Sequence, residues 1–228
     1  MEADWEVEIG AGAPVIEAPW PESSASPGAS AFPAFPAYPA FSAYIDLRRH
    51  PDRIGQIREA AAFPPLAALL VALNAPESPV WTSKCDLWEP EPGALACYID
   101  LLPREAAVFA HRQQAESFCR EYVARLAPIT RPKIATESAS EPSPDSSPES
   151  SPESSPESSP ESSIDLVIRQ AIAGQAEGFG ITAYLGARPT TLAEAAAGRV
   201  TTAGALAFAM AAFAGALPPL QPPATPAA

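Results

Sequence analysis

The chain has 228 residues and a formal net charge of −13 at pH 7, with 29 prolines that gather in a few stretches. When those stretches are set aside, about 160 residues remain, enough for one domain that buries roughly 70% of its surface. The acidic residues are not offset by any concentrated patch of lysine and arginine. The composition therefore excludes nucleic acid and an anionic membrane surface as partners.

The start of the chain and its cysteines bear on the compartment. Residues 1–4 read Met-Glu-Ala-Asp, without the basic and apolar segments of a secretory signal. The three cysteines, Cys85, Cys97 and Cys119, show no paired spacing. We therefore expect a cytoplasmic protein with free thiols. The apolar run 202–217 is too short for a membrane span and predicts a packed helix. Arginine outnumbers lysine twelve to two, which favours a GC-rich, bacterial genome.

The first predicted element is a strand over residues 4–9. Apolar Trp5, Val7 and Ile9 alternate with acidic side chains, which is the period of a strand with one face in water. A shorter extended piece is expected around Val15.

Two stretches of low complexity predict disordered inserts, and residues 218–228 predict a disordered tail. In residues 20–43 an aromatic-Pro-Ala triplet repeats with the period of a polyproline II helix. This repeat is either a ligand for an aromatic groove of a partner or a repeat that is tolerated at the surface. In residues 132–163 the sequence Ser-Ser-Pro-Glu occurs four times in a row from Ser146. Such a segment has too little apolar content to offset its ordering entropy.

Order resumes after the first insert. Residues 44–47 predict a short strand, and Pro51 opens a helical stretch. A second helix is expected over 65–74, because its leucines recur at i, i+3, i+4 and i+7. These leucines are Leu66, Leu69, Leu70 and Leu73.

Residues 80–88 and 95–102 predict a β-hairpin, and one helix is expected over 104–126. On the first strand, strict alternation assigns Trp81, Ser83, Cys85 and Leu87 to one face and Thr82, Lys84 and Asp86 to the other. On the second strand, Leu95, Cys97, Ile99 and Leu101 face inward, and Tyr98 and Asp100 face outward.

The sequence Tyr-Ile-Asp-Leu occurs at 44–47 and again at 98–101, each time before a helix. If the two copies are equivalent, Ile45 and Ile99 are buried. Asp46 and Asp100 then point to solvent, because side chains alternate across a strand.

The part after the second insert repeats the same layout. Strands are expected at 164–169 and 181–185, joined by a turn region over 174–180. A further helix follows, with a capping-box pattern at Thr191 and Glu194.

These elements predict an α+β fold: an antiparallel or mixed sheet built from three strand-pair-plus-helix units, with the helices packed on one face. The single domain comprises residues 1–19, 44–131 and 164–217.

The spacing of the residues argues against the common chemical motifs. Gly10-Ala11-Gly12 follows a strand, but Val15 stands where a dinucleotide fingerprint needs glycine. His111 and Cys119 are expected on one helix, roughly 12 Å apart, too far for a nucleophile and its base. No cysteine or histidine spacing matches a zinc site. We therefore expect no cofactor and no metal.

The candidate site is the polar face of the predicted sheet. Its side chains are Lys84, Asp86, Tyr98, Asp100, Asp165, Arg169 and Tyr184. Such a set forms an acid/base pair, a hard-cation site or a solvated face with cross-strand ion pairs.

Two functions remain open from the sequence. The first is a non-enzymatic soluble binding domain whose ligand is an unknown small molecule or protein. The alternative is a small enzyme that uses Asp86, Asp100 or Asp165 with Lys84 or Arg169. A pocket holding two of these carboxylates with perturbed pKa values favours the enzyme, and a flat solvated strip favours the binding domain.

Overall fold

The structure is a computed structural model that describes residues 1–19, 44–130, 161–189 and 199–217. The predicted tail, nearly all of the two predicted inserts and the capping-box pattern at Thr191 and Glu194 lie outside the described residues.

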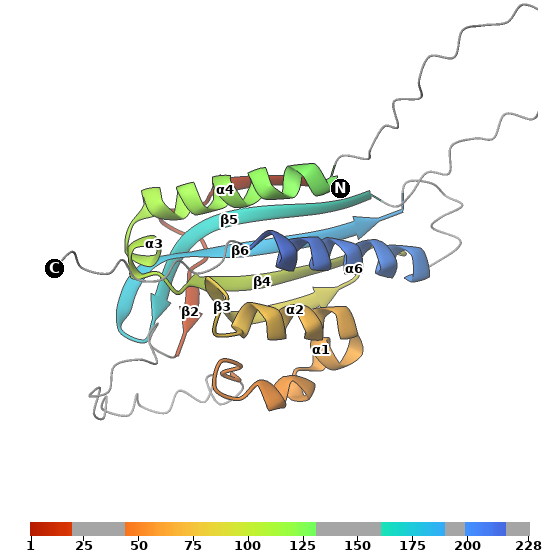
Figure 1. The fold of residues 1–228 in the computed structure, drawn as a ribbon, viewed down its shortest axis with the longest axis horizontal. Helices are drawn as coiled ribbons and strands as arrows, with labels where there is room; N and C mark the ends of the chain where they lie inside the picture. Colours follow the sequence, from red (N-terminus) through yellow and green to blue (C-terminus); the bar gives the residue numbers. More distant parts are fainter. Residues whose placement is uncertain (20–43, 131–160, 190–198, 218–228) are drawn as a thin grey trace, which may run out of the picture.

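Six strands form one mixed sheet (Figure 1). They are β1 (Glu2–Val7), β2 (Ile16–Ala18), β3 (Val80–Trp88), β4 (Leu95–Pro103), β5 (Glu161–Ala173) and β6 (Ala176–Arg188). The order across the sheet is β1-β5-β6-β4-β3, and β2 pairs with the far end of β5. β1 and β2 run parallel to β5, whereas the other neighbours are antiparallel. The predicted α+β class with a mixed sheet is confirmed.

Helices cover one face of this sheet. They are the 3₁₀ helix η2 (Pro51–Gln56), α1 (Arg58–Ala62), α2 (Pro64–Asn74), α3 (Ala106–Ala110), α4 (Arg112–Thr130) and α6 (Arg199–Ala216). One of them, α3, also reaches the opposite face, where its Phe109 packs at the hairpin end. In Figure 1, α4, α6 and α2 lie side by side in front of the strands, with α6 in the middle, and α6 contacts both neighbours. None of the helices in the described residues is long and apolar enough to cross a membrane.

The main core lies between the sheet and this helix layer, and simple alternation explains it. Every second residue of β4, β5 and β6 is apolar and faces the helices. The leucine stripe of α2 packs against them, and so do Leu206, Met210 and Phe213 of α6, the packed helix that the sequence predicted. Ile99 is 0% exposed and Leu66 is 0% exposed, so both predicted core positions are confirmed.

A second, smaller core closes the hairpin end of the opposite face. Ile16, Trp81, Leu102 and Phe109 meet there. A Cβ on Gly178 would lie 2.4 Å from the carbonyl oxygen of Phe109, so only glycine admits this approach. The predicted turn region 174–180 is too long, because β5 turns into β6 at Gly174 and residues 176–180 already belong to β6.

A β-bulge in β3 overturns part of the predicted alternation. The pairing with β4 shifts between Thr82 and Lys84, so Ser83 is the extra residue. Thr82 therefore faces the helix layer, where the side-chain amide of Asn74 donates to its Oγ1 at 2.7 Å. Trp81 lies on the opposite face with Leu102, contrary to the predicted assignment.

Residues 44–47 are not a strand, and the predicted orientation of Asp46 is wrong. Asp46 is 6% exposed, and its carboxylate accepts hydrogen bonds from the backbone and the guanidinium of Arg48. The Arg48 guanidinium in turn stacks on the Trp81 ring at 3.9 Å. A tight turn with a buried ion pair thus replaces the expected strand.

The predicted helix over 104–126 is interrupted. Extended backbone at His111 separates α3 from α4. His111 is exposed and lies at the break between the two helices, so it does not share a helix with Cys119 as expected. Strand β5 begins at Glu161, three residues earlier than predicted, because Glu161–Ser163 continue the pairing with β6.

Candidate functional site

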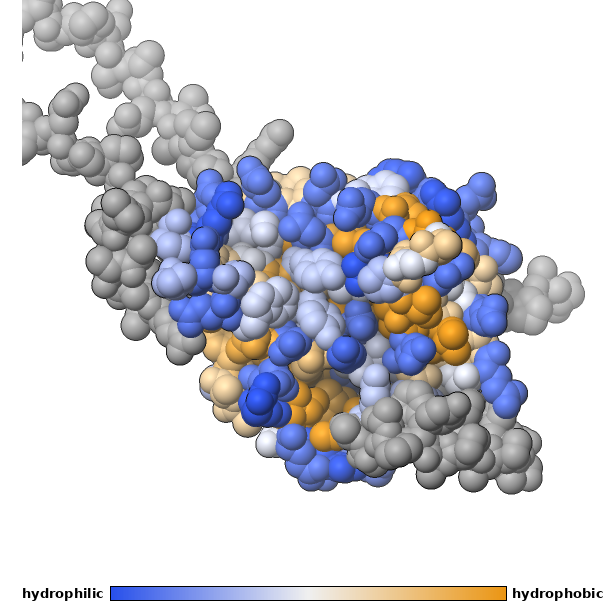
Figure 2. All heavy atoms as spheres, turned by 180° about the vertical axis from the view of Figure 1, so that it is seen from behind, coloured by the Kyte–Doolittle hydropathy of each residue, from blue (hydrophilic) through white to orange (hydrophobic). Residues whose placement is uncertain are grey.

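The seven candidate residues all lie on one face of the sheet, the face opposite the main helix layer, which we call the open face. The strand registers determine this placement, because they align these residues in cross-strand rows. One row contains Asp4, Asp165, Tyr184, Tyr98 and Asp86, and the next contains Glu6, Val167, Thr182, Asp100 and Lys84. Figure 2 views the molecule from this side, and hydrophilic and intermediate side chains occupy the middle of the face.

Three aromatic rings cross the open face and form what we call the aromatic row: Trp88, Tyr98 and Tyr184. The ring centroids of Trp88 and Tyr98 are 6.1 Å apart, and those of Tyr98 and Tyr184 are 6.2 Å apart. Tilted rings at such distances attract each other. Trp88 is 38% exposed, so the row ends in a ring that a partner can reach.

A chain of hydrogen bonds runs beside the aromatic row. Arg169 pairs with Glu8 at 2.6 Å and donates to the hydroxyl groups of Thr182 and Tyr184 at 3.3 and 3.1 Å. Thr182 donates in turn to the carboxylate of Asp100 at 2.7 Å. The network therefore holds Tyr184 and Asp100 in fixed positions.

Lys84 and Asp100 occupy opposite positions on β3 and β4. Burial raises the pKa of Asp100, although the bond from Thr182 and the charges of Arg169 and Lys84 oppose this shift. Tyr98 raises the pKa of Lys84, whose ammonium lies 5.7 Å from the centre of the Tyr98 ring. Lys84 therefore stays a cation beside the aromatic row.

The β1 side of the open face is strongly acidic. Glu2, Asp4 and Glu6 are exposed along β1, and Asp4 lies opposite Asp165 on β5. Burial raises the pKa of Asp165, and the neighbouring charges, Asp4 foremost, raise it further. Like charges thus crowd this edge.

The three candidate aspartates do not form one catalytic centre. Asp86 and Asp165 lie in the same row but three strand spacings apart, roughly 14 Å. Asp86 and Asp100 are diagonal neighbours on β3 and β4. Four hollows formed by the described residues are lined by none of these three carboxylates.

The thiols offer no nucleophile on this face. Burial raises the pKa of Cys85 and of Cys119 to about 12, and it raises the pKa of Cys97 as well. All three are free and protonated at neutral pH. Within the described residues, no group of three or more His, Cys, Asp or Glu side chains is placed to hold a metal ion.

Sequence reasoning missed several side chains of the open face. Thr182 links Arg169 to Asp100, and it could have been found two residues before Tyr184 on the same strand. Glu8 and the exposed acids of β1 were missed for another reason. They reach this face only because β1 pairs in parallel with β5, and no local pattern signals that pairing.

Comparison with protein-family models, with curated proteins and with solved structures finds no match.

Proposed function

We propose that the protein is a binding domain whose open face docks a cationic segment of a partner protein. The main observation in support of this proposal is that the aromatic row and a net negative charge lie on the same face. Eight carboxylates lie there against three cations, Lys84, Arg169 and Arg188, which gives a net charge of −5. The carboxylates are Glu2, Asp4, Glu6, Glu8, Asp86, Asp100, Glu161 and Asp165.

Both features suit lysine and arginine side chains. Carboxylates pair with their charged ends, and tyrosine and tryptophan faces attract cations that lie within about 6 Å. The protein already makes such contacts itself, since Arg169 lies 5.6 Å from the centre of the Tyr184 ring. A cationic partner would add contacts between cations, carboxylates and aromatic rings of the kind that Arg169 already makes on this face.

The crowding at Asp165 also supports a binding role. Like charges side by side cost stability, and a partner cation relieves that cost when it docks. The separation of Asp86 from Asp165 and the lining of the four hollows favour this proposal over an enzyme built on the same carboxylates.

Calorimetric titration with hexalysine at low ionic strength tests the proposal. The double variant Asp4→Asn, Asp165→Asn removes two exposed carboxylates of the open face. Each surface pair contributes about 0.5 kcal/mol, so the loss of two weakens hexalysine binding about fivefold. The matched control is Asp52→Asn, Glu121→Gln, which removes two exposed charges from η2 and α4.

The control separates position from net charge. We expect it to change hexalysine affinity less than twofold, although its net charge equals that of the first variant. Equal weakening by the two double variants would mean that hexalysine senses only the overall charge of the chain, and the docking role of the open face would be abandoned.

A further inference from the structure

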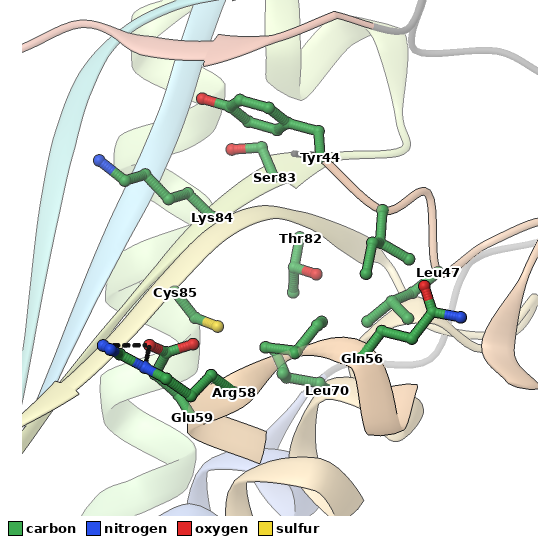
Figure 3. A pocket seen from close by; sticks show the side chains of 12 residues that line it. Tyr44, Leu47, Gln56, Arg58, Glu59, Leu70, Thr82, Ser83, Lys84 and Cys85 are labelled. Carbon is green, nitrogen blue, oxygen red and sulfur yellow. Dashed lines mark hydrogen bonds and ion pairs between the residues drawn. The ribbon is translucent and has the colours of Figure 1, made fainter. Parts of the chain in front are cut away.

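A cavity of about 310 Å³ lies at the edge of the sheet, between β3, the turn at 44–47 and the short helices η2 and α1 (Figure 3). Its floor is apolar. Leu47 and Leu70 are 4% and 1% exposed, and Ile45 and Ile57 are partly buried beside them. These four residues give the cavity an apolar wall of the kind that small-molecule sites usually have.

The bulge in β3 presents Ser83 to this cavity. Ser83 is the extra residue between Thr82 and Lys84, and it lines the cavity wall. Its Oγ is buried and forms no hydrogen bond with any residue that the structure describes. Bulges frequently redirect a side chain next to a site, and a buried hydroxyl group calls for a partner.

The charge of the lining points to an anion. Lys84 and Arg58 contribute two cations against the single carboxylate of Glu59, which Arg58 contacts at 3.0 Å. In Figure 3 the polar ends of Lys84, Ser83 and Arg58 lie toward the same side, away from Leu47 and Leu70.

This balance is the reverse of that in the whole chain, whose net charge is −13. A second hollow, at the other end of the sheet, is lined by Glu2, Glu91 and Glu161 with one cation, Arg188. The charged residues that line the cavity beside β3 are therefore mainly cationic, whereas the chain as a whole is anionic.

We propose that this cavity binds a small carboxylate with an apolar body, whose oxygens contact the Lys84 ammonium and the Ser83 hydroxyl while its chain lies on Leu47 and Leu70. The proposal does not rest on the docking role proposed for the open face, although Lys84 belongs to both sites. The aromatic row and the acids of β1 do not line the cavity.

The test is an amide chemical-shift titration of the full chain with octanoate. Saturable shifts are expected at residues 45–59 and 82–85. Octanol has the same chain without the charge, and inorganic phosphate has the charge without the chain. Each should bind about tenfold more weakly than octanoate. Octanol binding as tightly as octanoate would contradict the anion, and phosphate doing so would contradict the apolar body.

Variants locate the ligand within the cavity. Lys84→Gln should weaken octanoate binding about fivefold, because a charge-assisted hydrogen bond is lost. Ser83→Ala removes the second contact and should weaken binding about threefold, and thermal unfolding confirms that both variants fold. Arg125→Gln, an equal charge change on α4, should leave the affinity unchanged. The proposal is overturned by a lack of saturable shifts, by shifts confined to other regions, or by full affinity in Lys84→Gln.

Discussion

At the scale of single residues, the same four-residue sequence has two different environments. Asp46 and Asp100 are both preceded by Tyr-Ile and followed by Leu. The Asp46 carboxylate lies in a buried ion pair with Arg48, at 2.9 Å, and both side chains are 6% exposed. Asp100 instead accepts one hydrogen bond from Thr182 in a partly buried position on the open face, without a salt bridge to another described residue. Identical neighbours in sequence therefore do not imply identical energetics.

This contrast gives a paired prediction. Asp46→Asn should cost about 3–5 kcal/mol, because it removes the carboxylate that balances the buried Arg48 guanidinium. Asp100→Asn should cost less than about 1 kcal/mol, because the asparagine carbonyl accepts the same bond from Thr182. Urea unfolding of the two variants at pH 7 makes the comparison. A small loss of stability in Asp46→Asn together with a large loss in Asp100→Asn would contradict the two environments described above.

The raised pKa of Asp100 adds a pH dependence with a definite sign. The folded protein binds the proton of Asp100 more tightly than the unfolded chain does. The corresponding stability is present below the unfolded pKa, about 3.9, and is lost as the pH rises through the raised folded value. Asp100→Asn does not undergo this loss. The free energy of unfolding of Asp100→Asn, measured relative to that of the unsubstituted protein, should therefore increase from pH 4 to pH 7. A decrease over that range in urea unfolding would rule out a raised pKa of Asp100.

At the scale of elements, substitution of Gly178 tests how closely β6 and α3 approach each other. A Cβ on Gly178 would lie 2.4 Å from the Phe109 carbonyl oxygen, whereas a Cβ on Gly204 in α6 would meet nothing within 4 Å. Gly178→Ala should cost about 1–3 kcal/mol through overpacking. Gly204→Ala should add about 0.5–1 kcal/mol, because alanine favours the helix. Denaturant midpoints of the two variants provide the check, and a neutral Gly178→Ala would mean that α3 does not pack against β6.

The sequence was most informative where a local period reports burial. The leucine stripe of α2 and the alternation of β4 correctly predicted which side chains enter the core, and the same alternation placed Tyr98 and Asp100 on the open face. Local patterns failed where a long-range contact decides the conformation. The bulge at Ser83 lies next to Thr82, which forms hydrogen bonds with the side chain of Asn74 in α2. In the turn around Asp46, the carboxylate pairs with Arg48, whose guanidinium stacks on the Trp81 ring.

At the scale of the whole molecule, topology creates the charge of the open face. Strand β1 pairs in parallel with β5, and Glu8 contacts Arg169 across 161 residues of sequence. The alternation of β1 was read correctly from the sequence, but its place at the sheet edge was not. Two segments far apart in the sequence therefore build the acidic margin, while β4 and β6 supply two rings of the aromatic row.

The location of a bound cation tests the central claim most directly. Amide chemical shifts of the full chain should be followed during titration with hexalysine at low ionic strength and again in concentrated salt. The account predicts saturable shifts along β1, β5, β6 and β4, centred on the row that contains Asp165, Tyr184 and Tyr98, and predicts that salt weakens them. Shifts confined to the acidic stretch 132–160, with the open face unperturbed, would contradict the proposed docking surface.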